Sequence, residues 1–95
     1  MTHKELKSMQ KSYGYDHMQS MIDSGMAWRM EGAIGRQAMS TLECGACMLP
    51  KHAHYGPYGN RVPSRDELKK GTKGTFQNAV RFWTGVKEGN IFLEL

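Results

Sequence analysis

Apolar residues recur at helical spacing through the first half of the chain. The longest such pattern repeats every three or four residues, at Ala27, Met30, Ile34, Ala38 and Leu42. It predicts a helix that begins near Met26 and ends at Gly45, with Gly32 and Gly35 inside it. Because a glycine inside a helix costs about 1 kcal/mol relative to alanine, we expect these two to permit the close approach of another backbone.

Two shorter helices are predicted before this one, over about residues 3–12 and 16–24. Each opens with a capping pair, in which side chains satisfy backbone donors at the helix start: Thr2 with Glu5, and Asp16 with Gln19. The second helix and the one from Met26 form a helical hairpin that turns at Gly25. It differs from a DNA-reading helix-turn-helix, because Ser24 and Glu31 stand where that motif has apolar packing residues.

Glycine, proline and asparagine are dense between residues 49 and 74, which indicates a turn-rich loop. Within it, Ser64 and Glu67 have the spacing of a capping box and predict one helical turn through Leu68.

Residues 75–84 fit two structures almost equally well. As a helix, the segment is capped by Thr75, ends at Gly85 and has an apolar stripe that leaves out only Phe82. As a strand, it must be buried on both faces. We favour the helix, followed by a short terminal strand from Ile91 to Leu95, where apolar residues alternate.

These patterns predict one domain over residues 1–95, because a chain of this length can bury one small core. Its fold class is α+β, mainly α: a helical part over 1–48, the turn-rich loop over 49–74 and a C-terminal segment over 75–95. The last segment is expected to close the core with Phe76, Trp83 and Phe92.

The composition adds a modest positive charge. Thirteen Lys and Arg against nine Asp and Glu give a formal charge of +4, which favours acidic partners such as nucleic acid. The basic residues are scattered, with no long run. No apolar segment approaches the roughly 20 residues that span a bilayer, and no secretion signal is seen, so we expect a cytoplasmic protein with no membrane partner.

The chemically richest segment runs from Cys44 to His54. Cys44, Cys47 and His52 match the first three ligands of a zinc knuckle in spacing, and thiolates and imidazoles are ligands that zinc accepts. Pro57 stands where the fourth ligand belongs, so His54, His3, His17 or water would have to replace it.

Two other interpretations of the cysteines stay open. They can be small apolar fillers at a helix end, or a redox pair. A redox pair normally lies at a helix N-terminus, where the dipole lowers a thiol pKa, whereas this pair follows a helix C-terminus.

Tyrosine and arginine are frequent at protein-binding hot spots. The loop and the main predicted helix supply a candidate binding set of these types: Tyr55, Tyr58, Arg61, Arg65, Arg29 and Arg36. The alternative is that the tyrosines pack back on the hairpin and the arginines are solvated.

Part of the chain resembles a known kind of protein. The run from Ile22 to Gly32, continued by Gly35 to Ala38 and by Leu42, is similar to the signature IDSGxAWxLxGxxGRxAxxLI of small uncharacterised proteins of tailed bacteriophages. The segments 58–65 and 71–74 resemble the C-terminal part of some of them. The resemblance implies a small accessory phage gene, of a kind often made to act on host machinery.

No nucleophile triad, paired-carboxylate motif or cofactor fingerprint is supported, so we expect no enzyme. The leading hypothesis is a phage-encoded accessory protein that binds and modulates a host protein. The alternative is a basic nucleic-acid-binding protein with a zinc-knuckle-like site, and the third hypothesis is a metal-stabilised structural module. The sequence indicates no oligomeric state.

Overall fold

The computed structural model describes residues 1–30, 32–56 and 59–93. In chain order the elements are α1 (His3–Ser12), α2 (Asp16–Ser24), a 3-10 turn η1 (Met26–Trp28), α3 (Gly32–Cys44), strands β1 (His54–Tyr55) and β2 (Arg61–Val62), and α4 (Phe76–Lys87). The two short strands pair antiparallel, with Tyr55 opposite Arg61. The α+β, mainly α prediction is confirmed.

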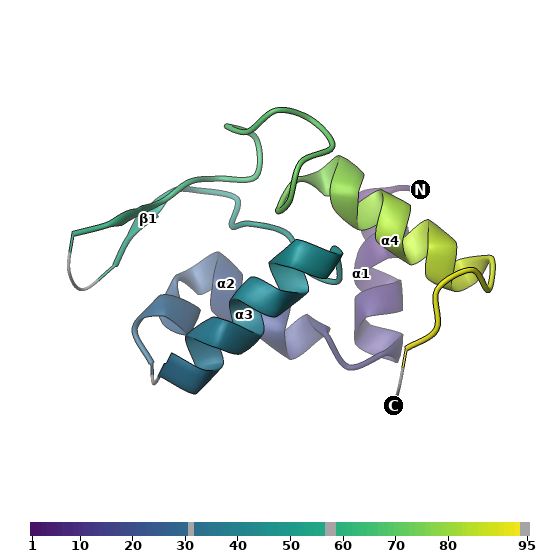
Figure 1. The fold of residues 1–95 in the computed structure, drawn as a ribbon, viewed down its shortest axis with the longest axis horizontal. Helices are drawn as coiled ribbons and strands as arrows, with labels where there is room; N and C mark the ends of the chain where they lie inside the picture. The colour runs from purple at the N-terminus through teal and green to yellow at the C-terminus, as the bar shows by residue number, and fades with distance from the viewer. Residues whose placement is uncertain (31, 57–58, 94–95) are drawn as a thin grey trace.

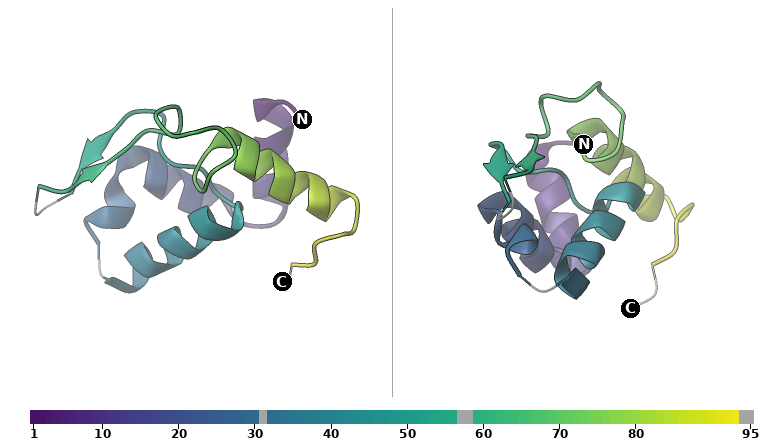
Figure 2. Two further views of the ribbon diagram at one scale, coloured as in Figure 1. Left: turned by 45° about the horizontal axis from the view of Figure 1, so that its top comes forward. Right: turned by 60° about the vertical axis from the view of Figure 1, so that its left-hand side comes forward.

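The molecule is elongated, about 41 by 28 by 19 Å. Helices α1 and α4 cross at one end, while α2 and α3 lie at the other, with the β1–β2 hairpin projecting beyond α2 (Figure 1). Turned views show the loop between β2 and α4 arching away from the helices (Figure 2).

The first and last helices begin as their sequences predict. The Thr2 hydroxyl accepts the N–H of Glu5, and the Thr75 hydroxyl accepts the N–H of Asn78. The choice of helix over strand for the C-terminal segment is confirmed. However, α4 does not end at Gly85, because Val86 is buried one residue further and the helix continues to Lys87.

The long helix predicted from Met26 is interrupted. The chain turns at Gly25, whose φ is +81°, forms only the 3-10 turn η1, and starts α3 at Gly32. Gly32 therefore opens a helix and does not lie inside one. The turn keeps Ala27 buried as the helical pattern expected, but Met30 is 48% exposed, so one position of the predicted apolar stripe lies at the surface.

Three smaller predictions also fail. Gln19 does not cap α2, because its amide is buried in contacts with other segments. The Glu67 carboxylate accepts the N–H of Ser64, but no helix follows over residues 65–68. Ile91 to Leu93 form no strand, since Ile91 packs back on Gly85; Leu95 lies outside the described residues.

Two clusters of buried side chains form the core, and residues 46–49 contribute to both. Ala46 and Met48 belong to the cluster around Trp83, between α1 and α4. Cys47 and Leu49 belong to the cluster around Leu42, between α2, α3 and β2. Alternate residues of this segment thus face opposite clusters, and the segment forms the wall between them.

Buried amides hold that wall in place. Gln19 accepts the N–H of Met48 at 2.8 Å and donates to the carbonyl of Met48 at 3.0 Å. Gln10 donates to Gln19 at 2.9 Å and to the carbonyl of Ala46 at 2.9 Å, which also accepts the indole N–H of Trp83 at 3.0 Å. These bonds satisfy backbone groups that no regular element could pair, which is why two glutamines lie inside the protein.

Candidate binding surface

The cysteine thiols do not have the environment of metal ligands. Cys47 is fully buried and its thiol donates to the carbonyl of Tyr15. Burial, with a smaller contribution from the charges of Cys44 and Asp23, raises the pKa of the Cys47 thiol to about 12, against the opposing hydrogen bond of Thr41. A metal ligand must be a thiolate, and this site strongly favours the thiol. The burial of Cys47 also disfavours a redox role, because reactive cysteines are partly exposed.

The other predicted ligands have separate surroundings. His54 directs its Nε2 at the carbonyl of Asp23, 2.9 Å away. Cys44 is exposed and bonds to the backbone of its own helix end, while His52 is exposed. Across residues 1–30, 32–56 and 59–93 no three His, Cys, Asp or Glu side chains are placed to hold a metal ion. The predicted site of Cys44, Cys47, His52 and His54 is therefore not assembled.

The predicted arginine and tyrosine set is divided by the fold. Arg65 is buried, and its guanidinium donates to Asp23 at 2.7 Å and to the carbonyl of Leu49 at 2.7 Å. Its expected role on an exposed patch is wrong, because it ties α2 to the residue 46–50 segment. Tyr55 is exposed on the hairpin, Arg29 is exposed after η1, and Tyr58 lies outside the described residues.

The two remaining arginines border two adjoining hollows, which together we call the α3 groove. Arg61 lines a cavity of about 330 Å³ between α3 and β2. Arg36 lines a neighbouring cavity of about 370 Å³ along α3. The two cavities share Trp28, Met39 and Glu43, so they adjoin each other along α3. Its apolar lining consists of Trp28, Met39, Leu42, Leu49, Val62 and Pro63.

The floor of the groove is rigid, whereas part of its wall is exposed. Leu42 and Val62 belong to the core and are 5% and 6% exposed. Met39, three residues before Leu42 on α3, is 48% exposed. Trp28 is half-buried at the end of η1 and packs against the same core cluster. The core thus holds Trp28 at the surface, beside the exposed Met39.

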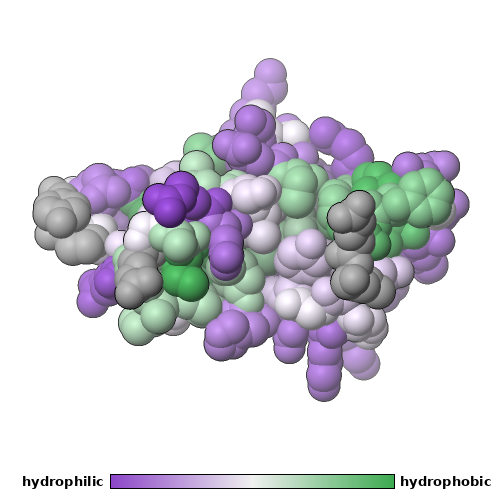
Figure 3. Space-filling view, turned by 60° about the horizontal axis from the view of Figure 1, so that its bottom comes forward, coloured by the Kyte–Doolittle hydropathy of each residue, from purple (hydrophilic) through white to green (hydrophobic). Residues whose placement is uncertain are grey.

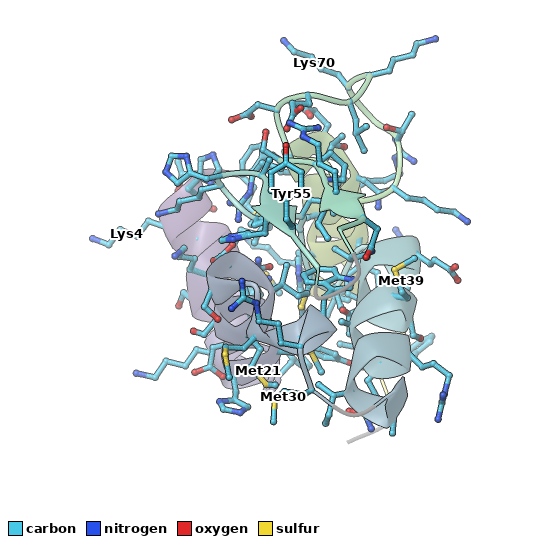
Figure 4. All side chains as sticks on the ribbon, turned by 90° about the vertical axis from the view of Figure 1, so that its left-hand side faces the viewer. Lys4, Met21, Met30, Met39, Tyr55 and Lys70 are labelled. Carbon is cyan, nitrogen blue, oxygen red and sulfur yellow. The ribbon has the colours of Figure 1, made fainter. Side chains whose placement is uncertain are left out.

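Met39 is separate from Met30, which is exposed to the same extent. Both side chains are 48% exposed, and Figure 4 shows them well apart. On the face shown in Figure 3, apolar side chains likewise gather in two areas, on either side of a polar middle. The exposed apolar surface is therefore not one patch, and the α3 groove can be tested independently of the rest.

Charges at the groove are mixed. Arg61 forms an ion pair with Glu67, and its guanidinium holds the pKa of that carboxyl down, after the larger effect of the Ser64 N–H. Glu43 lies in the part that both cavities share, and Lys73 closes the end beside Gly74. Among the described residues, Lys73 and Arg36 form no ion pair.

Sequence analysis found Arg36 and Arg61 but not the apolar lining between them. Trp28 belongs to the phage-like signature, yet nothing local indicates that it lies beside Val62 or Lys73. A second hollow, between α1 and the end of α4, has two lysines and two methionines but no aromatic side chain.

The comparisons with known proteins identify no relative: no family model, curated protein or solved structure matches this chain. Within the described part of the chain, the helices are all too short or too polar to cross a bilayer.

Proposed function

We propose that this is a phage-encoded accessory protein that acts in the host cytoplasm by binding a host protein, without catalysis, and that the α3 groove is its binding surface. The source and type of gene are supported by the likeness of residues 22–42 to the phage signature. The observation that carries the binding surface is the exposed Met39 beside the half-buried Trp28, over a buried apolar floor.

Such a surface has the properties of a protein-binding site. Tryptophan, methionine and arginine are enriched at interfaces, and hot spots lie in pockets that a partner can fully desolvate. Because the core already fixes Leu42 and Val62, binding would require little ordering of the floor. Each of its two cavities is at the lower end of the volume range of small-molecule sites, which suits one or two side chains of a partner.

The test uses two methionines of equal exposure. Met39→Glu places a charge in the groove. Met30→Glu makes the same change outside the groove, at a position that is also 48% exposed. A host protein is captured from bacterial lysate, purified, and titrated calorimetrically against wild-type and variant proteins. We expect Met30→Glu to bind like the wild type and Met39→Glu to bind at least ten times more weakly, or about 1.4 kcal/mol.

Circular dichroism and thermal melting establish that both variants fold. The proposal fails if the wild type captures no stoichiometric partner. It also fails if a purified partner binds folded Met39→Glu as tightly as the wild type, because the binding surface would then lie elsewhere.

A further inference from the structure

The positive charge of the chain is concentrated in one segment. Residues 68–87 contain five of its 13 Lys and Arg and none of its nine Asp and Glu, so the rest of the chain has eight basic against nine acidic residues. The segment comprises the loop before α4 and α4 itself. Its basic residues are Lys69, Lys70, Lys73, Arg81 and Lys87.

The loop that carries three of these lysines has a fixed shape. The Thr72 N–H and hydroxyl both donate to the carbonyl of Lys69, and the Thr75 N–H and hydroxyl both donate to the carbonyl of Thr72. Arg81 of α4 donates to the carbonyl of Gly71, which brings a fourth cation to the loop. Charges on such a preformed loop can bind a partner with little loss of backbone freedom.

The lysines themselves are free to interact. Lys69, Lys70 and Lys73 are exposed, and in the described part of the chain none of them forms an ion pair. Figure 4 shows Lys70 at the outer end of the loop, on the other side of the hairpin from Met30.

The basic loop and the α3 groove are continuous. Lys73 and Gly74 form one end of the groove, and the N–H of Leu49 in its floor donates to the carbonyl of Gly74 at 2.8 Å. Arg36 borders the other end. The only acid that lines the described groove is Glu43, since Glu67 is paired with Arg61.

We propose that the groove accepts an acidic, amphipathic segment of a protein, with apolar side chains over Met39 and Trp28 and carboxylates toward Lys69, Lys70 and Lys73. This inference rests on the proposed function and adds the chemistry of the partner. Charge complementarity selects the partner and speeds its association, while the apolar contacts supply most of the affinity.

The lining favours a protein segment over nucleic acid. Single-stranded nucleic acid binds through a series of aromatic side chains on which successive bases stack. Among the described residues that line the groove, Trp28 is the one aromatic residue, and the remaining apolar lining is aliphatic or thioether, which fits leucine or phenylalanine side chains. A duplex would contact the lysines alone and leave the groove empty.

The experiment selects peptides from a displayed library of random 16-residue sequences on the intact protein. We expect the selected peptides to combine leucine, phenylalanine or tryptophan with aspartate and glutamate, and to bind more weakly as salt increases. The variant Lys69→Glu/Lys70→Glu/Lys73→Glu should weaken this binding at least tenfold. The control Lys4→Glu/Lys7→Glu/Lys11→Glu, on exposed positions of α1, makes the same change in net charge and should have an effect below about threefold.

The outcomes separate the two proposals. The selected peptides could instead be neutral, with binding that is lost in Met39→Glu and kept in the loop variant. That result would leave the groove as a binding site and overturn the acidic partner. Peptides that are insensitive to Met39→Glu would overturn both. A 20-base-pair DNA duplex is tested as a competitor of the peptides. If it binds more tightly than they do and loses its affinity in the loop variant, the loop is assigned to nucleic acid and this inference is overturned.

Discussion

The sharpest test of the fold is the replacement of Gln19 by methionine. The two side chains have similar length and helix propensity, so the change removes hydrogen bonds and leaves the shape of the core almost unchanged. The N–H and carbonyl of Met48 then have no partner, because both bond only to Gln19. Met48 is fully buried, and a methionine in place of the amide keeps water out.

The expected loss follows from those two groups. An unpaired buried backbone group costs about 1–3 kcal/mol, so the pair costs about 2–6 kcal/mol. The added apolar burial offsets part of this, by about 1 kcal/mol or more. We therefore expect Gln19→Met to reduce the free energy of unfolding by about 1–5 kcal/mol. A 95-residue protein has only about 5–14 kcal/mol in total.

Urea denaturation followed by tryptophan fluorescence measures this loss, since Trp83 bonds to the same segment of chain. The matched control is Gln37→Met on the exposed side of α3, expected to change stability by less than about 0.5 kcal/mol. A loss below about 1 kcal/mol for Gln19→Met would refute the reasoning. Gln10→Met should be non-additive with Gln19→Met, because the two amides are bonded to each other.

Three further predictions concern other buried contacts. Asp23→Ala should cost about 3 kcal/mol in urea denaturation, because the buried Arg65 guanidinium loses its counter-charge. Stability should fall as pH rises from 9 toward 12, because folding raises the pKa of Cys47 from 9.0 to about 12 and the unfolded chain loses that proton first. Gly25→Ala should destabilise more than Gly14→Ala by at least about 1 kcal/mol in thermal melting: both have φ above +80°, but only Gly25 has a neighbouring side chain, the His54 ring.

Each of these has its own control and contrary result. Asp66→Ala changes an exposed aspartate and should be nearly neutral; equal losses at both positions would contradict the buried pair. Cys47→Ala should reduce the loss of stability between pH 9 and 12, whereas Cys44→Ala should not. If Cys47→Ala leaves the pH dependence unchanged, the loss belongs to other groups. Equal melting temperatures for the two glycine variants would contradict the contact between Gly25 and the His54 ring of the β1–β2 hairpin.

Local signals predicted most of the helices. The caps at Thr2 and Thr75 operate within four residues, so sequence spacing is enough to find them. The interruption at η1 was not predictable from periodicity, because Ala27, Met30 and Ile34 keep helical spacing through it, although Met30 is exposed in the structure.

The buried polar side chains could not be predicted from local pattern. Arginine is a residue type usually found at the surface, and the partner of Arg65, Asp23, is 42 residues away in the sequence. Gln10 and Gln19 lie on amphipathic helices where a polar residue suggests the solvent face, yet they pair backbone groups of a distant segment. The α3 groove likewise combines Trp28 with Val62 and Lys73, so only the folded chain assembles it.

The wall formed by residues 46–49 sets a limit on how this sequence can evolve. Its side chains enter two clusters in strict alternation, so one inserted or deleted residue would send each of them to the wrong side and move the carbonyl of Ala46 away from Gln10 and Trp83. Substitutions of similar size can be absorbed at these positions, but changes of length cannot. Surface loops, such as the one before α4, can change length. The segment 46–49 must keep its number of residues, because that number sets which cluster each side chain enters.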